Sequence, residues 1–206
     1  MVAALSPYRE SLSPIPLWED PVIRCFLAVE LPQEIKEILA ELQQRLRPAG
    51  AGVRWVRPEG FHLTLKFFGN MPEKNLPSLV RAAKEVSRGY SPFELVLSGL
   101  GFFPEKGPPR VIWVGLSGGL EPLLALQRDL ERAFEALGFP REKKGFHPHL
   151  TLGRIKEGRR ARELQRCAEE LEVPTGRFQV KTLTFYRSVL HPQGAIYSSL
   201  YRVDLE

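Results

Sequence analysis

The sequence is poor in the features that mark several large classes of protein. It contains only 2 cysteines among 206 residues, which predicts buried free thiols in a reducing compartment rather than a disulfide. No apolar run approaches the roughly 20 residues needed to cross a membrane, and Met1 to Pro21 lacks the basic start and apolar segment of a secretory signal. The sequence also has no glycine-rich phosphate loop and no Ser-His-Asp order. We therefore expect a cytoplasmic protein without membrane association.

Composition is that of an ordinary globular protein, but the charge is unevenly distributed. With 43% hydrophobic residues and a net charge of +5, the chain is expected to form one compact unit. The prolines of the first residues predict an irregular extension over 1–21, which leaves 22–206 for that single domain. The segment from Arg141 to Arg166 holds nine Lys or Arg against three Glu. This local excess favours an anionic ligand such as nucleic acid or phosphate, although a solvated charged surface would have the same composition.

The spacing of apolar residues predicts strands and helices in an order that occurs twice. Strands are expected at 22–31, 53–56, 61–68 and 93–100, with helices at 35–46 and 72–88. The second half repeats this order, with strands at 111–116, 147–155 and 178–186, helices at 120–137 and 159–171, and a last strand at 195–203. Corresponding elements lie 85 to 89 residues apart, which indicates an internal duplication. The sequence therefore predicts an α+β protein with two similar, interlocked lobes.

The tetrapeptide His-Leu-Thr-Leu occurs twice, at His62–Leu65 and His149–Leu152. Residues i and i+2 of a strand point to the same face, so each His stands beside its Thr while the leucines point into a core. A single His-x-Thr is common and carries little weight. Two copies, the first directly after Gly60-Phe61 and the second shortly after Gly145-Phe146, predict a duplicated half-site.

Two histidines on facing strands can perform acid and base catalysis together. Flanking one phosphorus atom, His62 and His149 would deprotonate an attacking water and protonate the departing oxygen, while Thr64 and Thr151 donate hydrogen bonds to the non-bridging oxygens. Lys66 has the strand parity of the first motif and is expected to add a cation. By contrast, the parity of Arg154 is opposite, and it would reach the groove only if its strand bends or bulges at Gly153.

A metal site is the alternative for the second motif, because His147 and His149 stand at i and i+2. Pro148 constrains this pair, neither cysteine is nearby in the sequence, and no acidic cluster accompanies it. We therefore expect no metal. His147 and His191 are instead expected to stabilise a turn or a strand end.

These motifs and their flanks resemble the 2H phosphoesterases, and among them the RNA 2′,3′-cyclic phosphodiesterases, also called 2′-5′ RNA ligases. The resemblance covers nearly all of the chain after residue 21. It rests on both motif segments, Phe61–Gly69 and Pro148–Arg154, and on Arg24–Pro32, Pro109–Gly115, Ser188–Leu190, Gly194 and Tyr197.

The resemblance implies a bilobal fold with antiparallel sheets lining a central cleft, helices outside, and no metal or other cofactor. It also implies hydrolysis of RNA 2′,3′-cyclic phosphate ends to 2′-phosphates, with His62 as the acid at the leaving O3′ and His149 as the base that activates water. The same chemistry in reverse would make 2′-5′ RNA linkages. The motifs are too alike for the residues alone to orient the two roles. We expect a monomer that binds RNA or a nucleotide.

The sequence leaves two other functions open. The first is a phosphodiesterase for another cyclic nucleotide phosphate. The second is a non-catalytic RNA-binding module, in which the basic segment and Phe61, Phe67 and Phe146 hold RNA by charge and stacking. Both intact His-x-Thr motifs are evidence against the second alternative.

Overall fold

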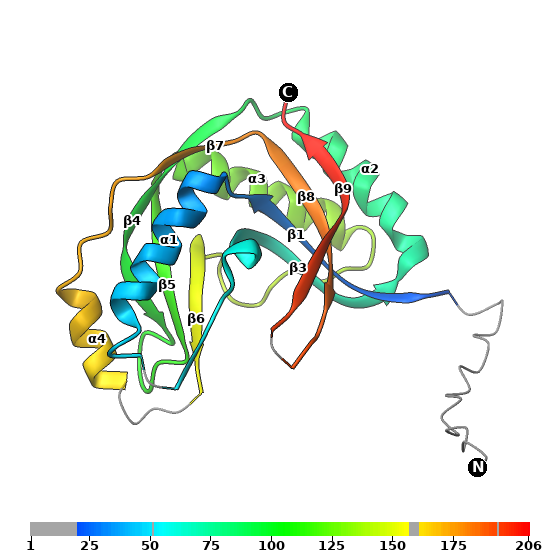
Figure 1. Ribbon diagram of the computed structural model, residues 1–206. Coiled ribbons are helices and arrows are strands. Elements are labelled where there is room, and N and C mark those ends of the chain that lie inside the picture. Colours follow the sequence, from blue (N-terminus) through cyan, green and yellow to red (C-terminus); the bar gives the residue numbers. More distant parts are fainter. Residues whose placement is uncertain (1–19, 51, 157–160, 193) are drawn as a thin grey trace, which may run out of the picture.

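The computed structural model describes residues 20–50, 52–156, 161–192 and 194–206 (Figure 1). Apart from Asp20 and Pro21, the extension predicted over 1–21 lies outside the described residues. In the described part of the chain, none of the helices is long and apolar enough to span a membrane. Cys25 and Cys167 are both free thiols, and burial raises the pKa of the Cys25 thiol to about 12.

The described strands form two antiparallel sheets, as the sequence predicts. The four-stranded sheet has the order β3-β1-β8-β9, with bounds His62–Pro72, Val22–Glu30, Thr182–Val189 and Ile196–Asp204. The five-stranded sheet has the order β2-β6-β5-β4-β7, with bounds Val53–Trp55, His149–Ile155, Val111–Gly118, Phe93–Phe103 and Arg177–Val180. The fold is therefore α+β, with each motif strand in a different sheet.

The two halves of the chain exchange strands between the sheets. Strand β4 belongs to the first half but pairs with β5 and β7 of the second. Strand β8 belongs to the second half but pairs with β1 of the first. The single strand expected at 178–186 is divided at Lys181, because β7 pairs in one sheet and β8 in the other. This exchange interlocks the lobes.

Two helices pack on each sheet. Helices α1 (Gln33–Leu46) and α4 (Ala161–Glu169) contact each other, and α4 also contacts β4 of the five-stranded sheet. On the four-stranded sheet, α2 (Leu76–Ser87) contacts β9, and α3 (Leu120–Glu135) contacts β3. Figure 1 shows α2 and α4 at opposite ends of the molecule. Short 3₁₀ turns at Pro58–Gly60 and Glu73–Asn75 precede β3 and α2.

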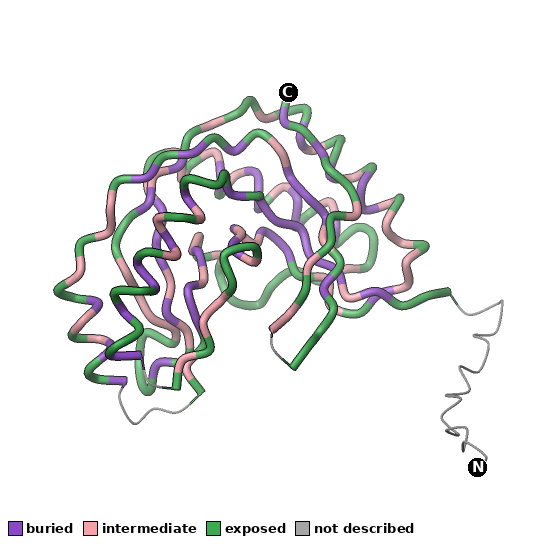
Figure 2. Tube along the Cα trace, viewed as in Figure 1, coloured by how far each residue is buried: buried purple, intermediate pink, exposed green. Residues whose placement is uncertain are grey.

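The helices have the apolar stripes that their sequence spacing predicts. Helix α1 buries Ile35, Leu39, Leu42 and Leu46, and α3 buries Leu123, Leu126, Leu130 and Phe134. Figure 2 shows these buried positions alternating with exposed ones along the helices. Each helix also buries one glutamine on its apolar face, Gln43 in α1 and Gln127 in α3. The motif leucines Leu63 and Leu150 are fully buried in the same core.

Candidate active site

Each motif strand contains a β-bulge at the last leucine of its motif. Along β3 and β1, Thr64 pairs with Ala28 and Lys66 with Leu27, so Leu65 is the extra residue. In β6 and β5, Thr151 pairs with Trp113 and Gly153 with Ile112, so Leu152 is the extra residue. A bulge reverses the side to which later residues point. From the His onward, burial in both strands therefore runs half-buried, buried, half-buried, buried, buried, exposed.

The bulge in β6 turns Arg154 toward the cleft side of the strand, which is the face that also carries His149 and Thr151. The sequence predicts this orientation only with a distortion at Gly153, and the structure places the distortion one residue earlier. Arg154 is exposed and lines a cavity of about 440 Å³ together with Arg54, Arg57, Gly60 and Tyr197. Its charge adds to the burial that lowers the pKa of His149 and partly offsets the burial that raises the pKa of Tyr197, which places the guanidinium near both rings.

The corresponding bulge in β3 makes the parity expectation for Lys66 wrong. Lys66 is 3% exposed, and its Nζ donates to the Glu131 carboxylate at 2.7 Å and to the Pro140 carbonyl at 2.6 Å. The ammonium group is thus engaged with α3 and the segment after it. Phe67 occupies the position equivalent to Arg154, and the guanidinium of Arg24 lies 4.5 Å from the centre of its ring.

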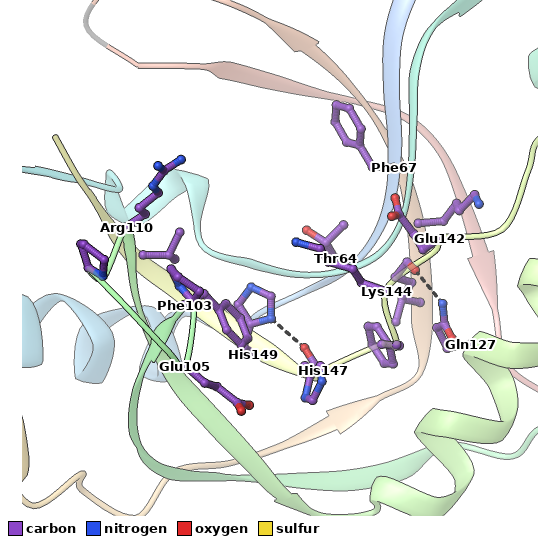
Figure 3. Close-up of a pocket in the computed structure, with 17 residues that line it drawn as sticks. Thr64, Phe67, Phe103, Glu105, Arg110, Gln127, Glu142, Lys144, His147 and His149 are labelled. Carbon is purple, nitrogen blue, oxygen red and sulfur yellow. Dashed lines mark hydrogen bonds between the residues drawn. The ribbon is translucent and has the colours of Figure 1, made fainter.

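The two motif histidines are oriented in the same way. Nδ1 of His62 lies 2.7 Å from the Gly60 carbonyl oxygen, and Nδ1 of His149 lies 2.7 Å from that of His147. A carbonyl oxygen can only accept, so Nδ1 must carry the proton in each ring. Nε2 of each histidine is then the atom that can accept a proton or, in the charged form, donate one. Figure 3 shows the bond between His147 and His149.

Aromatic rings surround both histidines. The ring of His62 lies 4.7 Å from that of Phe26 and 5.2 Å from that of Tyr197, measured between centroids. His149 has its ring edge-on to Phe103 at 5.0 Å, and Trp113 lies 6.2 Å away. These rings fix the imidazole planes and remove water from them.

This environment disfavours the charged form of both imidazoles. Burial lowers the pKa of His62 to about 4, against a smaller raising effect of its bond to Gly60, and the charge of His149 lowers it further. Burial also lowers the pKa of His149, and Arg154 and His147 add to that lowering. Because each motif histidine lies in a different sheet, the electrostatic effect of His149 on His62 supports a shared site where β3 and β6 contact each other.

A larger cavity of about 940 Å³ opens beside the second histidine (Figure 3). Thr64 and His149 line it from the two motif strands. Its other lining residues include groups that the sequence reasoning did not single out: Phe103, Glu105, Arg110, Gln127, Glu142 and Lys144. Most of these belong to loops between elements, where periodicity carries no signal. Thr151 is half-buried on β6, two residues after His149.

The alternative metal site gains no support from the side chains around His147. In the described ranges, no group of three or more His, Cys, Asp or Glu side chains could hold a metal ion. His147 uses its carbonyl to orient His149, and its ring lies 6.1 Å from that of Phe103.

Comparisons with known proteins agree on one family. The model of the LigT-like phosphoesterase family matches twice in tandem, at residues 29–113 and 114–197. The RNA 2′,3′-cyclic phosphodiesterase of Methanothermobacter thermautotrophicus is 37% identical over 179 residues, which cover 86% of this chain and 96% of that protein. A protein of the same name from Aeropyrum pernix is 36% identical over 166 residues, with coverage of 80% and 93%.

Solved structures show the same likeness. A crystal structure of a protein from Thermus thermophilus has a TM-score of 0.73 at 33% identity and covers 89% of this chain and 98% of that one. Escherichia coli LigT complexed with 3′-AMP has a TM-score of 0.72 at 26% identity, with coverage of 90% and 99%.

Proposed function

The chain belongs to the LigT-like phosphoesterase family, and we propose that it hydrolyses the 2′,3′-cyclic phosphate at the end of an RNA to a 2′-phosphate. The observation that carries this proposal is the pair of equivalent histidines, each holding Nδ1 on a carbonyl at 2.7 Å and leaving Nε2 for the reaction. The names of the relatives support the substrate class.

The proposed mechanism moves one proton at each histidine. Nε2 of a neutral His149 accepts a proton from water as the water oxygen bonds to phosphorus. Nε2 of a protonated His62 donates its proton to O3′ as the P–O3′ bond breaks. The products are a 2′-phosphate and a free 3′-hydroxyl. Proton exchange with solvent then returns both rings to their starting states. This orientation of the two roles follows the family resemblance.

Negative charge that develops on the phosphoryl oxygens is balanced by groups from both motif strands. We assign the hydroxyls of Thr64 and Thr151 as donors to the non-bridging oxygens, because each stands on the same face of its strand as a motif histidine. Arg154 supplies the cation on the second side. The larger cavity would take the terminal nucleoside, since Phe67 and Phe103 offer faces for stacking and Arg110 and Lys144 offer charges for the RNA backbone.

This chemistry needs no metal, because acid, base and oxygen donors all come from side chains. The test is incubation of an oligonucleotide ending in a 2′,3′-cyclic phosphate in excess EDTA, with identification of the product isomer. We expect complete conversion to the 2′-phosphate at the rate seen without EDTA. A 3′-phosphate product would reverse the assigned leaving group. Activity lost in EDTA and restored by zinc or manganese would support the His147 and His149 metal site instead.

Ligation can be measured in the same assay. Adding an RNA with a 5′-hydroxyl should give a small amount of 2′-5′-linked product, because that hydroxyl can replace water as the nucleophile: the base takes its proton, the new P–O5′ bond forms, and the acid protonates O3′ as the P–O3′ bond breaks. Binding of the oligonucleotide without any conversion would favour the non-catalytic RNA-binding module.

A further inference from the structure

A buried side-chain amide holds each of the two bulges. Gln43 of α1 is 2% exposed, and its Nε2 donates to the Leu152 carbonyl at 2.7 Å and to the Val56 carbonyl at 2.8 Å. Gln127 of α3 is 8% exposed, and its Nε2 donates to the Leu65 carbonyl at 3.3 Å. Leu152 and Leu65 are the extra residues of the two bulges. The duplication therefore extends from the motifs to the helices behind them.

Gln43 joins β2 and β6 at Leu152, the residue where β6 bulges against β5 on its other side. The regular pairing of β2 with β6 runs from Val53 to Trp55, which pairs with Gly153. Beyond it, the Val56 amide donates to the Leu152 carbonyl at 2.9 Å, and the two protons of the Gln43 amide reach the carbonyls of both residues. Both protons of the Gln43 amide are thus hydrogen-bonded inside the core. Removing the amide would take one donor away from each of the Val56 and Leu152 carbonyls, which is costly for buried groups.

The competing arrangement of β6 is the regular register without a bulge. A shift of one residue in a strand moves every later side chain to the opposite face. In that register Arg154 would point toward the α1 side of the sheet rather than into the cleft. We propose that Gln43 is a positioning residue for the reaction: by holding the Leu152 bulge, its amide keeps Arg154 on the cleft side of β6, beside His149.

The kinetic part of this inference rests on the proposed function, but its first test needs no turnover. The electrostatic neighbours of the His149 ring are His62 from β3 and His147 and Arg154 from its own segment. The charged side chains of Glu105, Arg110, Glu142 and Lys144 line the larger cavity beside it. Of these groups, Arg154 lies two residues after Leu152, the extra residue of the bulge. Nuclear magnetic resonance titration of the His149 ring in the full chain then reports how near the guanidinium lies.

We expect Arg154→Ala to raise the pKa of His149, because a neighbouring cation is removed. Gln43→Met keeps the length of the side chain and removes both hydrogen bonds, and it should move the pKa of His149 in the same direction. In the Arg154→Ala background, Gln43→Met should cause no further movement. The matched control is Gln33→Met on the exposed side of the same helix, whose amide donates to Glu37 at 3.0 Å. This control should leave the His149 titration unchanged.

Kinetics supply the second test through a double-mutant cycle with the cyclic-phosphate oligonucleotide. Gln43→Met should lower kcat/KM by about tenfold when Arg154 is present and by less than about twofold in the Arg154→Ala background. Equal factors in both backgrounds, or an unchanged His149 titration in folded Gln43→Met, would overturn the inference. If Arg154→Ala itself leaves turnover intact, the proposed role of Arg154 fails, while the titration still decides the role of Gln43.

If Gln43→Met does not fold, a measurement on the unaltered chain still tests the inference. The side-chain amide protons of Gln43 should exchange with solvent at least about a hundredfold more slowly than those of Gln33, because both of its bonds are buried. Similar exchange rates for the two glutamines would overturn the inference.

Discussion

His62 and His149 each bond through Nδ1 to a neutral backbone carbonyl. A carboxylate in that place would add a negative charge beside the imidazolium, whereas a neutral carbonyl selects the tautomer and raises the pKa by less than burial lowers it. Burial is then the larger effect, and both pKa values fall below the ordinary value of 6.5. The folded site therefore disfavours the charged form of both histidines.

The first prediction concerns these two side chains directly. His62→Ala and His149→Ala should each lower kcat by about 10² to 10⁴, because a positioned acid or base contributes that much to the rate. Single-turnover assays and circular dichroism together measure the loss and the fold. A well-folded single variant with most of its activity would remove that histidine from the mechanism.

The second prediction concerns the pH dependence of kcat/KM. The active free enzyme carries one proton on the pair, so activity falls when both rings are protonated and again when both are neutral. Since the pKa of His62 is lowered to about 4 and that of His149 also lies below 6.5, both limbs should fall below about pH 6.5. In the profile of kcat, the basic limb should move to higher pH, because bound phosphate favours the protonated acid.

Variants of the histidines then assign the two limbs. In the pH profile of the activity that remains, replacing the base, proposed to be His149, should remove the acidic limb. Replacing the acid, proposed to be His62, should remove the basic limb. A profile of kcat/KM that is flat between about pH 4 and 7 would show that histidine ionisation does not control the rate.

At the scale of elements, β3 is fixed to α3 by a buried charged network. Lys66 and Glu131 form an ion pair at 2.7 Å with side-chain exposures of 3% and 6%, and Gln127 donates to the second carboxylate oxygen at 3.2 Å. Strand β6 has no counterpart of this ion pair at the equivalent position, which is Gly153. The bulge in β3 thus has an ion pair in addition to the glutamine amide that supports both bulges.

The third prediction tests this network. Lys66→Met should lower the free energy of unfolding by about 3 to 5 kcal/mol, because it leaves the Glu131 carboxylate buried without its partner. Urea denaturation measures the change. The double variant Lys66→Met with Glu131→Met should recover most of the loss, since two packed apolar side chains replace the pair. A single variant as stable as the unaltered chain would show that the pair contributes little.

The elements also show which features the sequence could predict. Periodicity predicted the helices and most strands because apolar stripes and alternation follow from burial on one face. It failed at Lys66, because a bulge is a choice of backbone pairing that leaves no mark in a pattern of alternating residues. One residue did indicate a distortion in the sequence. Gly153 suggested that the second motif strand bends, and the expected orientation of Arg154 depended on that bend. The break at Lys181 escaped notice for a related reason, since the strands on both sides of it alternate polar and apolar residues and the change of sheet is a tertiary event.

At the scale of the whole molecule, the basic segment predicted over 141–166 divides into parts with different surroundings. Arg141 pairs with Glu135 at 2.6 Å, while Lys144 and Arg154 line the larger and the smaller cavity. Residues 157–160 lie outside the described residues. Under the proposed function, the charges that line the cavities are the ones that would contact an RNA backbone.

The fourth prediction separates the effect of these charges from the chemistry. KM for an oligonucleotide with a 2′,3′-cyclic phosphate end should rise steeply with salt, because each phosphate contact releases counterions. KM for a mononucleotide 2′,3′-cyclic phosphate should change little. Lys144→Gln should reduce the salt slope for the oligonucleotide by about one phosphate contact. Equal slopes for both substrates would mean that the segment is only a solvated surface.

Strand exchange between the sheets also governs how the protein can be made. On a ribosome the chain emerges from its first residue, and β1 is synthesised before every strand that pairs with it. One of its edges finds β3 early, but the other pairs with β8, which begins at Thr182. Strand β1, whose Cys25, Leu27 and Val29 are buried in the folded protein, therefore has one edge without its partner strand during most of translation. Nascent chains that end before β8 expose this unpaired edge of β1, and we expect them to pair with one another.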